Sequence, residues 1–348
     1  MKDNEPIITV LGPTATGKTG VAVRIAAELG GEIVSADSRQ VFRRMDIGSG
    51  KDLSEYQYNG NPIPYHLIDI EEPGVEYNVF RYQQAAYEAM EGIRARGNRI
   101  VLCGGSGMYV EAVLRGYRLF PVPENPELRK ELETHTDEEL TKMLAAYKSL
   151  HNDTDTSERP RLIRAIEIED YYAKHPELSE RVKPLDSAII VMCGERNHIR
   201  ERITRRLQAR LTEGMIDEVK ALLDEGIPPE RLIRYGLEYK FVTQYLTGDL
   251  HYGDMVSLLN TAIHQFSKRQ MTWFRRMERM GFRIHWVDAD LPAEEKFSNI
   301  YQCLREEGIS IYCGNDVKKR KNAKNLGDFR IFPHFLRFSA IKKYYFLK

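Results

Sequence analysis

A glycine-rich octapeptide near the N-terminus constrains the fold of this chain more than any other feature. Residues 12–19 read GPTATGKT and match the pattern G-x-x-x-x-G-K-[ST] in full. The octapeptide follows a short β-rich run, residues 6–11, and precedes a stretch with apolar residues at helical spacing, residues 20–29. A strand, a glycine-rich turn and a helix in that order are the context in which this motif forms a phosphate-binding loop. The motif therefore predicts an α/β core that binds a phosphate or a diphosphate.

The residue types of the octapeptide explain why such a loop binds anions. Glycines let successive backbone N–H groups point inward, and the helix that follows adds the positive end of its dipole. Lys18 supplies a mobile positive charge, and the Thr19 hydroxyl is a suitable ligand for Mg²⁺, which we expect as the cofactor. The predicted diphosphate-binding residues are Gly12, Pro13, Thr14, Ala15, Thr16, Gly17, Lys18 and Thr19.

Further apolar runs alternate with helical patterns along the chain. Strands separated by helices indicate a parallel sheet that is covered on both faces. The predicted fold class is therefore α/β, a P-loop NTPase-like parallel sheet flanked by helices, with a helical insertion domain. The runs that predict these further strands are residues 32–35, 98–103, 187–193 and 283–287.

The chain changes character at residue 120, where prolines and polar helical segments replace the alternating pattern. Residues 317–348 carry ten Lys/Arg side chains against one acidic residue, Asp328, which indicates an appended basic tail. The predicted division is residues 1–119 as the first part of the P-loop core, 120–186 as a helical insertion, 187–312 as the second part of the core, and 313–348 as the tail.

Composition excludes several classes of protein. The four cysteines, Cys103, Cys193, Cys303 and Cys313, fit no zinc-site spacing and suggest a reducing compartment. No apolar run approaches the roughly 20 residues of a membrane helix. Lys+Arg and Asp+Glu are both 51, so the net charge itself argues neither for nor against a nucleic-acid partner. We expect a cytoplasmic monomer without membrane contact.

The motifs alone do not exclude that the protein is a kinase of a small metabolite. Ordinary P-loop NTPases carry a second apolar strand that ends in a magnesium-binding aspartate, whereas the run at 98–103 ends in Gly104-Gly105-Ser106-Gly107. The segment His66–Asp69 is a weak substitute for that strand. The poor second magnesium motif disfavours a kinase, although arginines that could form a kinase lid are present at Arg159, Arg161 and Arg164.

Seven short segments distributed over about residues 6–290 carry a family signal. They are GPTATGKT at 12–19, SADSRQVFRRMDIGSGK at 35–51, YHLIDI at 65–70, CGGSGMYVEAVLRG at 103–116, RLIRAIEI at 161–168, RLTEGMIDEVKALL at 210–223 and KRQMTWFR at 268–275. In this order they resemble the tRNA dimethylallyltransferase family. The resemblance implies transfer of a dimethylallyl group from dimethylallyl diphosphate to N6 of the adenine 3′ of the anticodon, at tRNA position 37, with release of diphosphate. It implies the tRNA anticodon stem-loop as partner and a tRNA-binding role for the insertion at 120–186, and the lack of a zinc finger indicates the bacterial type.

The resemblance also implies catalytic roles. The acceptor N6 is a poor nucleophile because its lone pair is delocalised into the ring, so a carboxylate must take its proton, and Asp37 is the candidate base. The alternative for Asp37 is a helix cap, because Asp-Ser after a strand often starts a helix. Ser106 would hydrogen-bond the bridging oxygen of the donor, and Lys18 and Arg234 would stabilise the leaving diphosphate.

An enzyme that reaches a base within an anticodon loop must turn that base out of the stack. The run of arginines at Arg200, Arg202, Arg205, Arg206 and Arg210, taken alone, favours a solvated helix face. The positions that match tRNA-facing positions of the family are Asp37, Ser38, Arg39, Gln40, Ser106, Pro160, Arg161, Leu162, Ile163, Arg164, Lys268, Arg269, Gln270 and Arg275.

Two of the departures from the family pattern concern predicted catalytic residues. Ser106 stands where the family usually has threonine, so a hydroxyl is retained. The family usually has Gly-Tyr-Lys/Arg-Glu after the arginine at 234, whereas residues 236–239 read GLEY. The main rival is a related transferase that acts on free AMP or ATP. The helical insertion favours an RNA substrate, because a mononucleotide does not need it.

Overall fold

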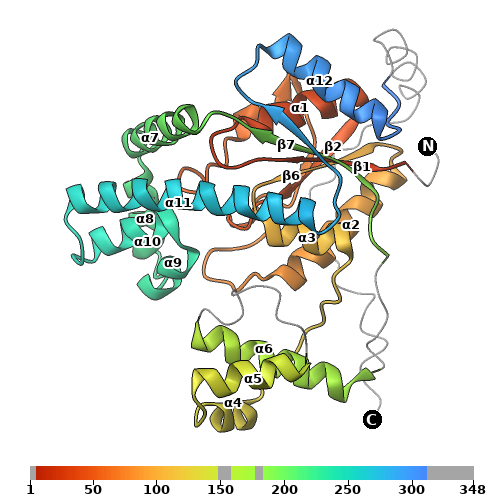
Figure 1. The fold of residues 1–348 in the computed structure, drawn as a ribbon. Coiled ribbons are helices and arrows are strands. Elements are labelled where there is room, and N and C mark those ends of the chain that lie inside the picture. Colours follow the sequence, from red (N-terminus) through yellow and green to blue (C-terminus); the bar gives the residue numbers. More distant parts are fainter. Residues whose placement is uncertain (1–4, 148–157, 177–182, 312–348) are drawn as a thin grey trace. The chain divides into compact units, whose positions relative to one another are not determined.

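The structure is a computed structural model that describes residues 5–147, 158–176 and 183–311 (Figure 1). The predicted basic tail, residues 313–348, lies outside the described residues, as do residues 148–157 and 177–182 of the predicted insertion. Within the described ranges no helix is both long enough and apolar enough to cross a membrane.

A six-stranded sheet in the order β5-β2-β6-β1-β7-β8 forms the core, and every neighbouring pair of its strands is parallel. Each apolar run that predicted a strand forms one, so the predicted α/β P-loop-like fold class is confirmed. The strands are β1 (Ile7–Leu11), β2 (Gly31–Ala36), β5 (Tyr65–His66), β6 (Arg99–Gly104), β7 (Ser187–Cys193) and β8 (Ile284–Asp288), with a separate hairpin of β3 (Gln57–Tyr58) and β4 (Asn61–Pro62) preceded by the 3₁₀ turn η1 (Leu53–Glu55).

Helices cover both faces of this sheet (Figure 1). Side chains alternate along a strand, so β1 sends Ile8 and Val10 into one apolar cluster and Ile7 and Leu11 into another. The first cluster includes side chains of α1 and α12, and the second includes side chains of α2, α3 and α11. Such burial on both faces is typical of parallel sheets. The helices are α1 (Lys18–Leu29), α2 (Val79–Ala95), α3 (Gly107–Arg115), α11 (Tyr252–Arg279) and α12 (Ala293–Glu306).

A third apolar cluster joins five helices to the segment that follows β2. Val41, Phe42 and Met45 of that segment pack with the helices that precede α11 and with α11 itself. The arginine-rich stretch after β7 forms two helices, which are separated at Gly214, a residue with φ 102°. Besides α11, the helices are α7 (Arg196–Thr212), α8 (Met215–Asp224), α9 (Pro229–Tyr235) and α10 (Leu237–Leu246).

The predicted insertion contains three described helices with an apolar cluster of their own, built around Leu132, Leu140 and Leu162. The backbone N–H of Thr136 donates to Glu139 and the N–H of Glu139 donates to the Thr136 hydroxyl, which forms a capping box before the second helix. The predicted domain boundaries stay a prediction. The helices are α4 (Pro126–Leu132), α5 (Asp137–Tyr147) and α6 (Arg159–Lys174).

Candidate active site

The phosphate loop runs from the end of β1 to the first turn of α1. Gly17 precedes α1 with φ 73°, and no side chain caps the helix, so the N–H groups of its first turn stay available to an anion. Inside the loop the Thr16 hydroxyl donates to the Pro13 carbonyl at 2.8 Å. A Cβ at Gly12 would lie 2.6 Å from Thr16 Oγ1, so only glycine allows the loop to close this tightly. The local sequence therefore builds an anion-binding turn.

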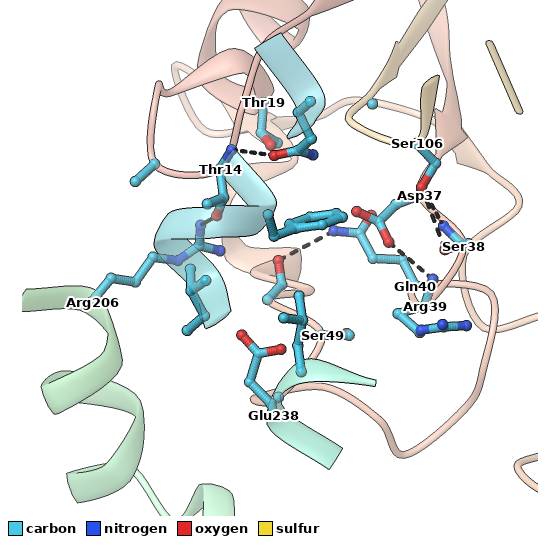
Figure 2. Close-up of a pocket in the computed structure, with 18 of the residues that line it drawn as sticks. Thr14, Thr19, Asp37, Ser38, Arg39, Gln40, Ser49, Ser106, Arg206 and Glu238 are labelled. Carbon is cyan, nitrogen blue, oxygen red and sulfur yellow. Dashed lines mark hydrogen bonds between the residues drawn. The ribbon is translucent and has the colours of Figure 1, made fainter. Parts of the chain in front are cut away.

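Three neighbouring strands bring three of the four predicted catalytic side chains, those of Lys18, Asp37 and Ser106, to one cavity of about 510 Å³ (Figure 2). The phosphate loop follows β1, Asp37 follows β2, and Ser106 lies two residues beyond β6. Because β2, β6 and β1 are adjacent and parallel, their carboxyl ends meet at the same edge of the sheet, where ligands bind in open α/β folds. Lys18, Thr19, Asp37 and Ser106 all line the cavity, and their catalytic and binding roles stay predictions.

The carboxylate of Asp37 is held in a fixed orientation. Its Oδ1 accepts the backbone N–H of Arg39 at 2.9 Å, which stabilises a turn. Residues 37–52 contain no helix, so the structure does not bear out the helix-cap alternative. The Ser106 hydroxyl accepts the N–H of Ser38 at 3.1 Å, so the loop after β2 and the loop after β6 are joined next to Asp37. The turn uses one carboxylate oxygen, and the geometry therefore accommodates a base as well as a turn.

Positive charge dominates the wall of the cavity. Burial lowers the pKa of the Lys18 ammonium, and burial likewise lowers the pKa of the Arg39 guanidinium. Burial also raises the pKa of the Glu238 carboxyl, which lines the same cavity. A bound anion would offset the cost of burying these cations, so the electrostatics favour an anionic ligand.

The two segments predicted to face tRNA from the core differ in where they lie. Ser38, Arg39 and Gln40 line the cavity. On α11, Arg269 and Gln270 line it too, whereas Lys268 and Arg275 are exposed and lie outside the lining.

Gln270 is buried and ties the phosphate loop to the loop after β6. Its Oε1 accepts the N–H of Thr14 at 3.0 Å, and its Nε2 donates to the Gly105 carbonyl at 2.9 Å. A Cβ at Gly105 would collide with this amide, so the glycine is needed for the contact. The structure therefore gives Gln270 a bridging position between the two loops, and its predicted contact with tRNA stays a prediction.

The predicted tRNA-binding segment 160–164 lies on α6 and contributes nothing to the lining of the cavity. Leu162 and Ile163 are buried in the apolar cluster of α4–α6, which leaves their side chains no access to RNA and corrects the expectation for them. Arg164 donates to the Val122 carbonyl at 2.7 Å. Pro160 and Arg161 keep exposed side chains.

The position of Arg234 also requires a correction. Its side chain is exposed on the last turn of α9 and does not line the cavity. The buried side of that turn carries Leu232 and Tyr235, so Arg234 lies on the solvent side. The structure therefore does not bring Arg234 to the phosphate loop.

The cationic side chains that sequence reasoning missed come from α7. Arg202, Arg206 and Arg210 line the cavity, whereas Arg200 and Arg205 are exposed, so the solvated-face interpretation holds for only part of the run. A spacing of four residues places the three on one face of a helix and was the available signal.

The residues of the site fit a Mg²⁺ ion that takes most of its oxygen ligands from a bound diphosphate and from water. Thr19 lines the cavity beside Lys18, while no cluster of three or more His, Cys, Asp or Glu side chains suited to a metal occurs among the described residues. Asp69, the weak substitute for a magnesium-binding aspartate, pairs with the buried Lys51 instead and does not line the cavity. Mg²⁺ commonly takes one protein oxygen and completes its shell with phosphate and water.

One wall of the cavity, Gly48–Gly50, is fixed by a carboxylate from α8. Glu218 accepts the N–H groups of Asp46, Ile47 and Gly48 at 2.6–3.0 Å. Its Oε1 also accepts the hydroxyl of Tyr239 at 2.8 Å. Glu218 therefore couples the wall to the helices that pack behind it.

Replacing Glu218 with glutamine is expected to destabilise the protein by about 2 kcal/mol, because one amide oxygen cannot replace a carboxylate with four donors. Chemical denaturation measures this loss. Glu213→Gln, at an exposed position just after α7, is the matched control and should stay near wild-type stability. Equal stability of the Glu218 variant and the control would contradict the role of Glu218 as an anchor.

The fold and the site together define an α/β P-loop protein in which the phosphate loop shares its cavity with a carboxylate and several arginines. A family model described as IPP transferase matches residues 40–277, and one described as isopentenyl transferase matches residues 6–72. The chain therefore belongs to the IPP transferase family, which confirms its resemblance to the tRNA dimethylallyltransferases.

Individual relatives agree with this assignment over nearly their whole length. The chain is 56% identical over 308 residues to tRNA dimethylallyltransferase 1 of Parabacteroides distasonis, which covers 88% of this chain and 100% of the relative. It is 57% identical over 300 residues to tRNA dimethylallyltransferase 2 of Bacteroides fragilis, with 86% and 98% covered. The crystal structure of the full-length tRNA isopentenylpyrophosphate transferase from Bacillus halodurans superposes with a TM-score of 0.64 at 29% identity, and covers 92% of this chain and 100% of that one.

Proposed function

We propose that this chain transfers the dimethylallyl group of dimethylallyl diphosphate to N6 of the adenine 3′ of the tRNA anticodon, and that it releases diphosphate. The observation that carries the proposal is the shared cavity, which places a phosphate loop, the Ser106 hydroxyl and the Asp37 carboxylate together. The high identity to relatives named tRNA dimethylallyltransferase supports the same activity.

The first half of the reaction breaks the allylic C–O bond of the donor. Negative charge then develops on the leaving diphosphate, where the N–H groups of the phosphate loop and the Lys18 ammonium would stabilise it. The Ser106 hydroxyl would donate to the bridging oxygen that takes the bonding electrons. Mg²⁺, held by Thr19 and the diphosphate, would supply further positive charge against the leaving group when it is bound.

The second half forms the bond between the allylic carbon and N6 of the adenine. The nitrogen gains positive charge as the bond forms, so one of its protons becomes acidic and passes to the Asp37 carboxylate. A carboxylate is a weak base, which suits a proton that leaves late. The products are the N6-prenylated adenine, diphosphate and the proton, so the step balances without an oxidant or a reductant.

An adenine within an RNA loop must be unstacked before its N6 reaches this cavity. The side chains of Arg39 and Gln40 line the cavity within three residues of Asp37, where they would contact the flipped base or its neighbours. Arg269, which is exposed on α11 and also lines the cavity, would contact RNA there as well. The names of the relatives favour tRNA over free AMP or ATP as acceptor.

The decisive experiment incubates the protein with dimethylallyl diphosphate, Mg²⁺ and an unmodified anticodon stem-loop, followed by digestion and mass spectrometry of the nucleosides. We expect isopentenylated adenosine and an equal amount of diphosphate, no requirement for ATP, and loss of product when EDTA removes the metal. A parallel reaction with AMP as acceptor should give no product. Efficient prenylation of AMP, or transfer of the terminal phosphate of ATP without prenyl transfer, would contradict the proposal.

A further inference from the structure

Two arginines of α7 converge beside the phosphate loop. Arg206 donates to the Thr14 hydroxyl at 3.3 Å, and Figure 2 shows its side chain reaching from α7 toward the loop. A Cβ at Gly50 would collide with the Nη2 atoms of both Arg206 and Arg210. The two guanidinium groups therefore lie against the same glycine, next to the residues that bind phosphate.

Arg206 donates to the half-exposed carboxylate of Asp52 at 3.4 Å, whereas no carboxylate of the described residues lies within hydrogen-bonding distance of Arg210. The Arg210 side chain is only 9% exposed, and its Nη2 hydrogen-bonds to no other residue that the structure describes. Its closest carboxylates are those of Asp52, at 3.9 Å, and Glu238, at 4.0 Å. Charge-assisted N–H···O bonds are about 2.7–2.9 Å long, so both carboxylates are too distant to satisfy the guanidinium.

The electrostatic surroundings of Arg210 also disfavour its positive charge in the absence of an anion. Burial, and the neighbouring charge of Arg206, lower the pKa of the Arg210 guanidinium. Asp52 is half-exposed and also faces Arg206 at 3.4 Å, so a single screened carboxylate serves both arginines. A buried cation without a hydrogen-bonded partner is costly, and an anion between the two guanidinium groups would remove that cost.

We propose that Arg206 and Arg210 form a second phosphate-binding arm of the site, which binds the terminal phosphate of the prenyl donor's diphosphate. The planar guanidinium donates two parallel N–H groups to phosphoryl oxygens, a geometry that a lysine cannot provide. The arm acts with the phosphate loop because Arg206 already contacts Thr14 of that loop. This inference rests on the proposed function and names the residues that complete its donor site.

The donor's diphosphate fits this arm better than a phosphate of the RNA backbone does. Arg210 is nine-tenths buried in the cavity wall, whereas the phosphates of a nucleic acid stay at the surface of the protein. The same pair lies within reach of the phosphate loop, so a single diphosphate can contact both. A small anion that enters the cavity therefore accounts for the buried arginine.

The test measures binding of inorganic diphosphate with Mg²⁺ to Arg206→Gln and to Arg210→Gln by calorimetry, without RNA or prenyl donor. Each variant is expected to weaken the diphosphate affinity by about 10- to 100-fold, the usual effect of losing charged hydrogen bonds. Arg205→Gln makes the same change of charge at an exposed position of α7 and should bind diphosphate as the wild type does. The affinity for the anticodon stem-loop should be unchanged in all three variants.

Wild-type diphosphate affinity in both folded variants would overturn the inference. Loss of stem-loop binding with diphosphate binding intact would assign the pair to the RNA backbone and would overturn it as well. If Arg210→Gln fails to fold by circular dichroism, Arg206→Gln decides alone, because the Arg206 side chain is 33% exposed. Binding is measured without turnover, so failure of this inference is distinct from failure of the proposed reaction, which is judged by its product.

Discussion

Replacing Asp37 with asparagine is expected to lower kcat for prenyl transfer to the anticodon stem-loop by about 100- to 10,000-fold, the usual contribution of a general base. An amide cannot accept the proton of N6. The bond between N6 and the allylic carbon then has to form without a base, which slows the chemical step. Single-turnover assays with radiolabelled donor measure the chemical step directly. Binding of diphosphate should be unchanged, because the phosphate loop follows a different strand.

Asparagine and alanine at this position separate catalysis from local structure. The asparagine carbonyl oxygen keeps the hydrogen bond to the N–H of Arg39, whereas alanine removes it. If Asp37 serves only the turn, Asp37→Asn should be active and Asp37→Ala impaired. If it is the base, both variants should lose turnover equally, and near-normal rates in Asp37→Asn would contradict the proposed mechanism.

The local parts of the fold and site could be predicted from the sequence. The apolar run at 187–193 located β7 to the residue, and the octapeptide placed Lys18 and Thr19 at the start of α1. Asp37 and Ser106 were predictable because each follows a strand closely, and parallel strands bring such residues to one edge. These features depend on neighbouring residues in the chain, which a sequence displays directly.

The remaining part of the site depends on how distant helices pack, which local patterns do not specify. Arg206 and Arg210 reach the cavity because α7 packs against α11, and Glu238 reaches it from the start of α10. Arg234 was expected in the site through a motif match, but the turn of α9 directs Tyr235 inward instead. A motif match locates a segment, and the orientation of the helix decides which of its side chains faces the ligand.

The same limit applies to residues whose burial a motif does not reveal. Leu162 and Ile163 sit within a family motif, yet helical periodicity turns them into the apolar cluster of α4–α6. Gln270 belongs to another motif and is buried between two loops, where its amide matches one donor and one acceptor. Both cases show that a residue within a family motif can have a structural role, in packing or in joining two loops.

Replacing Lys18 with alanine is expected to lower kcat/KM for dimethylallyl diphosphate by about 100- to 1,000-fold, as removal of one preorganised donor does elsewhere. The ammonium lies in the cavity at the start of α1, where it would face the charge that develops on the leaving group. Steady-state kinetics at varied donor concentration measure the loss. Lys220→Ala, which removes an exposed lysine of α8, is the matched control and should keep wild-type kinetics.

Lys18 also predicts the alkaline limb of the pH profile. Burial lowers the pKa of its ammonium, so in the free enzyme the positive charge is lost below the pH at which an ordinary lysine titrates. Binding of dimethylallyl diphosphate requires the protonated Lys18 side chain. The value of kcat/KM for this donor should therefore fall as the pH rises through that lowered pKa. The residual activity of Lys18→Ala should lack this fall, because the titrating group is gone. An identical alkaline limb in the variant would show that another group limits the reaction and that Lys18 does not contact the diphosphate as an ammonium.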